Sequence, residues 1–238
     1  MEPTAAVLFD LDGTLVDSGY LHTVCWWQAL AEHGHRVPMA RVHGALGLSG
    51  GRLLDELLGP GRDRDEDEPI SAGHAALCAR YSAVLQPFAE AAPLLRECLL
   101  RGWQVVLVSP AGPVAARELA VLGRALDGEE PPVAAGSPGP ELLRTALALA
   151  GAVAEHSVLV ADTVWDVRAA GRVGLPCVAV RTSGIAEQDL LAAGAAEVHP
   201  DVGALLAQLD DSLLARPRVF GQAGIRAGGE VTSSWRSP

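Results

Sequence analysis

The sequence predicts an α/β protein with a Rossmann-like parallel β-sheet core and an inserted α-helical domain. Two observations carry this prediction. Short apolar runs bounded by turn residues alternate with stretches of helical periodicity over residues 89–215. Between residues 17 and 88, three helical patterns follow one another with no strand pattern between them. Alternation is typical of βαβ units, whereas an unbroken helical segment after the first strand indicates an insertion.

The predicted strands are short, continuous apolar runs, which suit a parallel sheet whose faces are both covered. In chain order they are AAVLFD (5–10), QVVLVS (104–109), PVAAG (132–136), SVLVAD (157–162) and CVAVR (177–181).

The helices predicted for the core have apolar residues at helical spacing, and several begin after proline and close at glycine. They are AAPLLRECLLRG (91–102), PVAARELAVLGRAL (113–126), PELLRTALALAGA (140–152) and VWDVRAAGRVG (164–174).

The insertion is predicted from the helical patterns YLHTVCWWQALAEHG (20–34), GGRLLDELLG (50–59) and SAGHAALCARYSAVL (71–85). Its acidic connector RDRDEDEP (62–69) predicts a solvated loop, because dense charge and proline disfavour packing.

These elements predict how the chain divides into domains. We expect an α/β core from residues 1–16 and 89–215, and a helical insertion over 17–88. Residues 216–238 contain glycine, serine and arginine without periodicity, which predicts a loosely ordered tail.

The composition excludes several classes of partner. A formal net charge of −11 offers no basic surface for a nucleic acid. No apolar run approaches the roughly 18 residues that span a bilayer, and the first residues lack the charged start of a secretory signal. We therefore expect a cytoplasmic monomer or homodimer that binds a small molecule. Buried free thiols are expected for the four cysteines, Cys25, Cys78, Cys98 and Cys177, which lack disulfide or zinc-ligand spacing.

All 18 basic residues other than histidine are arginines, and the chain contains no lysine. This excludes Schiff-base chemistry, a pyridoxal-phosphate anchor and the lysine of a nucleotide-binding P-loop. The glycine-rich segment GLSGGR (47–52) is therefore interpreted as a turn that enters a helix.

Carboxylates follow the predicted strands at the positions where ligands bind in open α/β sheets. Asp10 and Asp12 close the first strand, and Asp162 closes a later one, with Asp166 one helical turn further on. Ser109 ends another strand. Like charges gathered at one edge are unfavourable without a cation, and a set of oxygen ligands suits Mg²⁺.

A D-x-D sequence alone is a weak signal, because it also occurs in metal-dependent glycosyltransferases and in capping turns. Here a strand precedes it, Gly-Thr follows it and a second acidic pair ends a later strand. Together, DLDGTLVDS (10–18) and ADTVWDV (161–167) resemble the haloacid dehalogenase-like (HAD) superfamily, particularly its phosphoglycolate phosphatase and β-phosphoglucomutase branch with a helical cap. The resemblance covers about residues 5–210.

The resemblance implies a Mg²⁺-dependent, two-step phosphoryl transfer. Asp10 would attack phosphorus to form an aspartyl-phosphate, while Asp12 would protonate the leaving oxygen and then activate water. The metal would be held by the Asp10 carboxylate, the Asp12 backbone carbonyl and Asp162, with Asp166 organising its shell.

The resemblance also implies a set of groups that contact phosphate or substrate. His22, at the entry to the cap, would contact Asp12 or the substrate. The groups expected around the phosphate are Leu11, Gly13 and Thr14 in the turn after the first strand, Ser109, and the residue at position 137.

Two departures from the family pattern affect the phosphate site. The family carries a lysine in a KPxPD-like stretch, and the matching stretch here is SPGPE (137–141), with Ser137 at the lysine position. Arg144 is a poor replacement, about 10 Å of helix rise further along. Pro110 follows Ser109 where the family offers a backbone N–H, and proline has none.

The function expected from the sequence is a phosphatase for a small phosphorylated metabolite, weakened by the missing lysine. The first alternative is a catalytically silent relative with a binding or regulatory role. A sugar phosphomutase would need firm phosphate binding at two sites, and a D-x-D glycosyltransferase would need a sugar-nucleotide domain.

Overall fold

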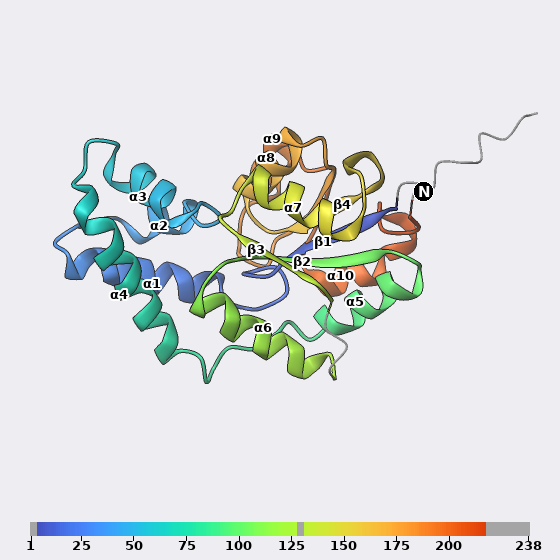
Figure 1. The fold of residues 1–238 in the computed structure, drawn as a ribbon, viewed down its shortest axis with the longest axis horizontal. Coiled ribbons are helices and arrows are strands. Elements are labelled where there is room, and N and C mark those ends of the chain that lie inside the picture. Colours follow the sequence, from blue (N-terminus) through green and yellow to red (C-terminus); the bar gives the residue numbers. More distant parts are fainter. Residues whose placement is uncertain (1–3, 128–130, 218–238) are drawn as a thin grey trace, which may run out of the picture.

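The core of the protein is a sheet of six parallel strands. The computed structural model describes residues 4–127 and 131–217. The strands run in the order β3-β2-β1-β4-β5-β6, so that the strand order reverses on either side of β1 (Figure 1). Such a reversal opens a crevice beyond the carboxyl ends of the strands, here beside β1 and β4. The strand bounds are β1 Ala6–Asp10, β2 Gln104–Pro110, β3 Val133–Gly136, β4 Val158–Ala161, β5 Cys177–Val180 and β6 Glu197–His199.

Helices cover both faces of the sheet. Side chains alternate between the two faces along each strand, and both faces are apolar, so each face needs a cover. Val7 and Phe9 pack into one apolar cluster, whereas Ala6 and Leu8 pack into the other. The first face is covered by α5 (Ala91–Leu100), α6 (Pro113–Ala125) and α10 (Val202–Ala207). The second is covered by α7 (Pro140–Ala150), α8 (Val164–Arg172) and α9 (Glu187–Ala193). The predicted strands and core helices are confirmed, whereas β6, α9 and α10 were not predicted.

The helices of the insertion form a cap beside the carboxyl edge of the sheet (Figure 1). They are α1 (Gly19–Glu32), α2 (Met39–Gly44), α3 (Gly50–Leu58) and α4 (Asp67–Arg80). A separate apolar cluster that includes Leu30, Leu54 and Ile70 lies between them. Residues 47–49 enter α3, as the glycine-rich segment predicts.

The two chain segments that join cap and core lie side by side. The Asp17 amide donates to the Gln86 carbonyl over 3.0 Å, and the Phe88 amide donates to the Leu15 carbonyl over 2.9 Å. This pairing agrees with a connection near residues 16 and 89, although the domain division itself stays a prediction.

The prediction of a solvated loop for residues 62–69 is wrong in part. A short 3₁₀ helix covers Arg64–Glu66, and α4 begins at Asp67. Acidic residues favour a helix N-terminus, and the Asp63 side chain accepts a hydrogen bond from the Asp65 amide. The Arg62 side chain is only 3% exposed and pairs with Asp55 and with Asp67, the latter over 2.7 Å. Ion pairing therefore orders this acidic segment.

The expected tail, residues 216–238, lies almost entirely outside the described residues. Among the residues that are described, no helix has both the length and the apolar character needed to cross a membrane.

Candidate active site at the carboxyl edge of the sheet

Three carboxylates from two neighbouring strand ends meet in the crevice. Asp10 ends β1, Asp162 directly follows β4, and Asp166 lies in the first turn of α8. One oxygen from each of the three lies within 4.8 Å of the others. The structure thus brings together three of the four aspartates that follow predicted strands, whereas Asp12 belongs to a neighbouring group.

The turn after β1 holds the Asp162 carboxylate against the Asp10 strand end. The Thr14 hydroxyl lies 2.9 Å from Asp162 Oδ1 and 3.3 Å from Asp10 Oδ2. The Ser183 hydroxyl, after β5, donates to Asp162 Oδ2. Gly13 has a φ of +75°, and a Cβ there would collide with Asp162 and Ser183. Glycine is therefore needed at this position for both its conformation and its small size.

Asp166 is fixed by the helix cap of α8. The Thr163 hydroxyl accepts from the Asp166 amide over 3.2 Å and donates to the Asp166 carboxylate. This N-cap satisfies an amide that the helix leaves free, and it aims the carboxylate at the crevice.

The three carboxylates hold their protons more tightly than exposed ones. Burial, together with the charges of Asp166 and Asp162, raises the pKa of Asp10 well above its ordinary range. Burial raises the pKa of Asp162 to about 6, and burial with the Asp162 charge raises the pKa of Asp166 to about 7. Unfavourable negative charge is thus concentrated at one point of the site.

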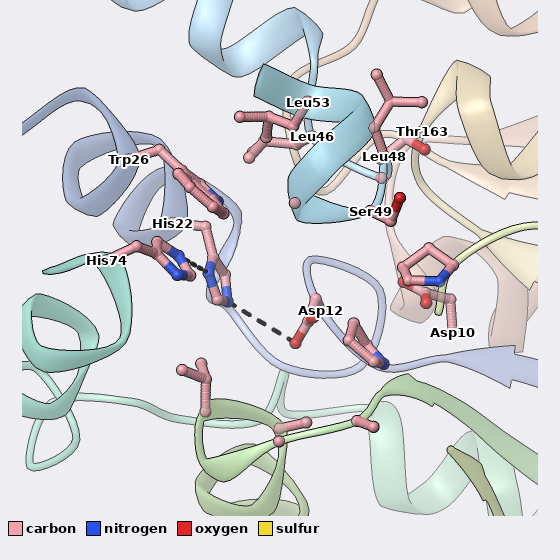
Figure 2. Close-up of a pocket in the computed structure, with 18 of the residues that line it drawn as sticks. Asp10, Asp12, His22, Trp26, Leu46, Leu48, Ser49, Leu53, His74 and Thr163 are labelled. Atoms are coloured by element: carbon pink, nitrogen blue, oxygen red, sulfur yellow. Dashed lines mark hydrogen bonds and ion pairs between the residues drawn. The ribbon is translucent and has the colours of Figure 1, made fainter. Parts of the chain in front are cut away.

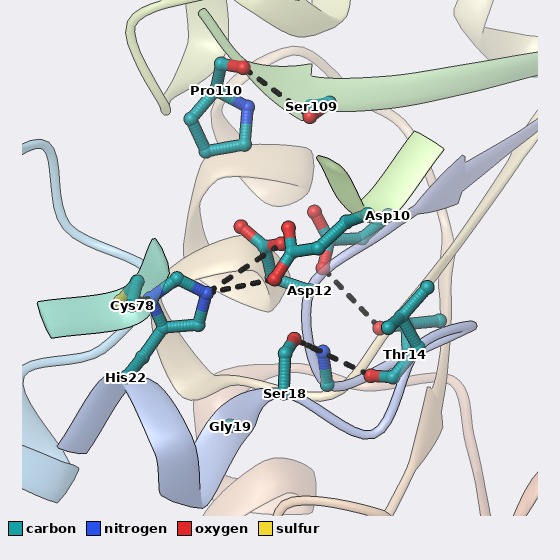
Figure 3. Close-up of polar contacts among 12 residues, drawn as sticks. Asp10, Asp12, Thr14, Ser18, Gly19, His22, Cys78, Ser109 and Pro110 are labelled. Atoms are coloured by element: carbon teal, nitrogen blue, oxygen red, sulfur yellow. Dashed lines mark hydrogen bonds and ion pairs between the residues drawn. The ribbon is translucent and has the colours of Figure 1, made fainter. Parts of the chain in front are cut away.

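Asp12, His22 and Glu118 form a second polar group next to the first. Figure 3 shows the His22 ring directed toward Asp12. His22 Nε2 lies 2.9 Å from Glu118 Oε1 and 3.8 Å from Asp12 Oδ1. Burial and the Glu118 charge raise the pKa of Asp12 well above its ordinary range. Burial opposes ionisation of Glu118, but hydrogen bonds with Asp12 and His22 outweigh it and lower the Glu118 pKa.

The Asp12 and Glu118 carboxyls are neighbours, with one oxygen of each within 4.8 Å of the other. Asp12 Oδ1 and Glu118 Oε2 are both buried and receive no hydrogen bond from another group. A single proton between the two carboxyls would satisfy both atoms, which agrees with the raised pKa of Asp12 and the lowered pKa of Glu118. The pKa directions therefore favour a protonated Asp12 beside an ionised Glu118.

A cavity of ≈ 690 Å³ lies between the cap and this acidic edge (Figure 2). The cap contributes apolar side chains to its wall, namely Trp26, Leu46, Leu48 and Leu53. The core contributes Val114, Leu142 and Leu143 beside the four aspartates. Among the described residues that line it, the basic ones are His22 and His74, and none is an arginine.

The expected phosphate-binding groups are not all directed into the cavity. The Gly13 amide donates to Val16 and to Ser18 within its own turn. Ser109 is buried and its hydroxyl donates to the Pro110 carbonyl over 3.2 Å, whereas Pro110 itself lines the cavity (Figure 3). Leu11 is fully buried, and its carbonyl accepts from the Leu15 and Val16 amides.

The segment 137–141, which has Ser137 where the family has a lysine, lies at the edge of the cavity. Ser137 is exposed after β3, and the following Pro138 and Gly139 line the cavity. Arg144 pairs with Glu141 on the surface of α7 and does not line the cavity. No arginine of the described chain replaces the lysine at the cavity wall.

Sequence reasoning missed Glu118, Thr163 and Ser183. Glu118 carried a usable signal, because it lies with Ala115 and Leu122 on the buried stripe of α6. A lone acid on an apolar helix face is expensive to bury without a partner. Ser183 carried no such signal, because it lies in a loop whose path depends on the whole sheet.

The protein is a capped α/β protein: its parallel sheet is doubly wound, a helical cap lies beside it, and carboxylates stand at the strand ends below the cap. The chain belongs to the haloacid dehalogenase-like hydrolase family, whose model matches residues 4–174. The family resemblance and the capped fold expected from the sequence are thereby confirmed. Among curated proteins, no match is found.

Solved structures with the same fold cover most of the chain. A hydrolase from Pseudomonas syringae is 28% identical, with a TM-score of 0.81, over 87% of this chain and 99% of its own. A putative β-phosphoglucomutase from Bacteroides vulgatus is 19% identical, with a TM-score of 0.78, over 90% of this chain and 89% of its own. A HAD family hydrolase from Deinococcus radiodurans R1, solved with bound phosphate and sodium, is 22% identical. Its TM-score is 0.62, over 92% of this chain and 100% of its own.

Proposed function

We propose that the protein is a Mg²⁺-dependent phosphatase that hydrolyses a small phosphorylated metabolite through an aspartyl-phosphate on Asp10. The observation that carries this proposal is the arrangement of Asp10, Asp162 and Asp166, whose oxygens lie within 4.8 Å of one another at the cavity. Membership in a hydrolase family supports the same reaction class.

The donor set fits Mg²⁺. All three residues offer carboxylate oxygens, the ligand type that Mg²⁺ prefers, and their raised pKa values indicate a negative charge that lacks a cation. Asp10, Asp162 and Asp166 would hold the ion, together with the backbone carbonyl of Asp12. When bound, Mg²⁺ offsets the repulsion between the Asp10 carboxylate and a phosphate dianion.

The side chains of the chain supply the remaining chemistry. Asp10 attacks phosphorus as the ester bond breaks, and Asp12 gives its proton to the departing alcohol oxygen. Asp12 is then a carboxylate and accepts a proton from the water that attacks the aspartyl-phosphate. Glu118 and His22 hold Asp12 in place and keep its proton available.

The cavity wall favours an uncharged leaving group. The cap side presents Trp26 and leucines together with the acid Glu68, and no arginine of the described residues lines the cavity. A phosphorylated acid would bring a second negative charge to this wall without a partner, which is costly. A phosphomutase would need a second phosphate site, for which the same wall offers no cation.

Phosphate release from a broad panel of esters, with and without Mg²⁺, tests this function. We expect slow turnover that requires Mg²⁺ and disappears in Asp10→Asn. Rearrangement of a sugar phosphate without net phosphate release would identify a phosphomutase instead. No turnover of any ester by protein that binds Mg²⁺ would support the silent relative.

A further inference from the structure

A buried cluster of histidine and cysteine side chains lies between α1 and α4, beyond the acidic group of the site. His22 Nδ1 lies 3.0 Å from His74 Nε2 and 3.8 Å from Cys78 Sγ. Cys78 Sγ lies 3.4 Å from His74 Nε2. Figure 2 shows the two rings facing one another beside Trp26. Three good ligands for a transition metal therefore converge at one point.

The helices bring these ligands together by their spacing. His22 and Cys25 are three residues apart on α1, and His74 and Cys78 are four residues apart on α4. Residues at these spacings share one helix face. Each helix thus places a His and a Cys on the face that meets the other helix.

The separations agree with tetrahedral coordination. Bond lengths of about 2.0–2.1 Å to nitrogen and about 2.3 Å to sulfur give about 3.3 Å between two nitrogens and about 3.6 Å between nitrogen and sulfur. The observed nitrogen–sulfur separations of 3.4 and 3.8 Å lie on either side of the expected value, and the nitrogen–nitrogen separation of 3.0 Å is a few tenths of an ångström shorter than expected. Shifts of a few tenths of an ångström would seat an ion at the centre.

His22 has the hydrogen-bond partner that metal-binding histidines commonly have on the ring nitrogen that does not face the metal. His22 Nε2 lies 2.9 Å from the Glu118 carboxylate, so Nε2 carries the proton and Nδ1 can present its lone pair. The His74 ring stacks on Trp26 with centroids 4.2 Å apart. Burial and the neighbouring His22 lower the pKa of His74 to about 3, so His74 is uncharged at neutral pH.

We propose that His22, His74 and Cys78 form a second metal site, for a borderline-soft divalent ion such as Zn²⁺, that links α1 to α4. Two nitrogens and one sulfur select this ion over Mg²⁺, which prefers oxygen. Binding releases the Cys78 thiol proton to solvent and leaves a fourth coordination position for water. The site uses none of the three carboxylates at the strand ends, although its ligand His22 also contacts Glu118 through the other ring nitrogen.

Cobalt titration of the full-length protein tests the site, because Co²⁺ replaces Zn²⁺ and bonds to thiolate give a charge-transfer absorption that oxygen ligands do not. We expect this absorption at one equivalent of Co²⁺ and its loss on addition of Zn²⁺. Cys78→Ser should abolish it, and His74→Gln should weaken binding at least about tenfold. Cys98→Ala, in the core, is the matched control and should leave it unchanged.

A further variant separates the two metal sites. Asp162→Asn, which removes an oxygen ligand, should retain the cobalt–thiolate absorption in full. Zn²⁺ should also raise the melting temperature of the parent protein but not that of Cys78→Ser. The proposal is overturned if the parent shows no thiolate absorption with Co²⁺. Absorption that persists in Cys78→Ser would equally overturn it.

Discussion

The chemistry of single residues in this protein is set by buried acids without a lysine. Four aspartates line the crevice, Glu118 is buried next to Asp12, and no arginine of the described cavity wall balances these acids. The four are Asp10, Asp12, Asp162 and Asp166. The neighbours of each acid underlie the proposed roles: Glu118 raises the pKa of Asp12, as an acid catalyst requires, whereas the mutual repulsion of the other aspartates favours a cation.

Glu118→Gln tests the effect of Glu118 on the pKa of Asp12. Removing the Glu118 charge removes a cause of the raised Asp12 pKa, so Asp12 should lose its proton at lower pH. We expect the alkaline limb of the kcat profile to move to lower pH and kcat near neutrality to fall about 10²-fold, with KM little changed. An unchanged pH profile would show that Glu118 only supports the fold.

Ser137→Lys tests the missing charge at the phosphate site. Ser137 is exposed beside Pro138 and Gly139 of the cavity wall, so a lysine side chain there can reach inward. We expect the variant to raise kcat/KM at least about tenfold, which corresponds to about 1.4 kcal/mol of transition-state stabilisation. Ser137→Met, of similar length without charge, is the control and should give no increase. Equal gains in both variants would contradict the electrostatic explanation.

The sequence predicted the site residues that follow strands. It did not predict Glu118, Thr163 and Ser183, whose side chains contact those residues. Asp10, Asp12, Asp162 and Asp166 each stand at or just beyond a strand end, where parallel topology fixes their meeting point. Whether the Gly13 amide and the Ser109 hydroxyl face the cavity depends on local hydrogen bonds, which a motif does not specify.

At the scale of elements, the N-cap of α8 couples local helix stability to the site. Thr163→Ala removes the hydroxyl that bonds the Asp166 amide and carboxylate, and should cost about 1 kcal/mol of unfolding free energy, or about 2–4 °C in melting temperature. Thr163→Ser, which keeps the hydroxyl, should retain most of this unfolding free energy. Ser49→Ala is the matched control, because Ser49 precedes α3 without a side-chain cap. Equal losses in Thr163→Ala and Ser49→Ala would contradict the role of the cap.

Helices and strands were predictable from the sequence where the pattern of apolar residues determines them. They were less predictable where ion pairs determine the local structure. The strands at 6–10 and 104–110 are continuous apolar runs and were found within one residue of their ends. The 62–69 segment reads as solvated by composition, yet Arg62 and its acidic partners order it. The three-residue β6 is too short for a period of two to be recognised.

For the whole molecule, the raised carboxyl pKa values link stability to pH. With pKa values of about 6 for Asp162 and about 7 for Asp166, the folded chain binds more protons than the unfolded chain, whose carboxyls titrate near pH 4. Without metal, the free energy of unfolding should therefore fall as pH rises from about 4 to about 7.

Mg²⁺ should reverse this trend at neutral pH and above. At about 100 times its dissociation constant it adds about 2.7 kcal/mol, or roughly 5–10 °C in melting temperature. Thermal melts at pH 5 and pH 8, with Mg²⁺ or with a chelator, measure both effects. A chelated protein that is more stable at pH 8 than at pH 5 would contradict the assignment.

The cavity as a whole predicts substrate preference. Its apolar cap wall and its lack of arginine should favour phosphate esters of uncharged alcohols over esters that carry a carboxylate. We expect kcat/KM values at least about tenfold apart for size-matched pairs, because an unpaired buried charge costs more than about 1.4 kcal/mol. Introducing a cation in the wall, as Leu48→Arg, should narrow the difference. A parent protein that prefers the carboxylated ester would contradict this description of the wall.

The most direct measurement of the central claim, that Asp10 carries the phosphoryl group, is the mass of the protein after reaction with acetyl phosphate. Asp12→Asn should slow hydrolysis of the intermediate, so this variant should gain one phosphoryl group when Mg²⁺ is present and lose it on treatment with hydroxylamine. Peptide mapping should place the group on Asp10, and Asp10→Asn in the same background should gain none. A parent enzyme that turns over phosphate esters while Asp12→Asn gains no mass, or a gain that persists in Asp10→Asn, would contradict the account.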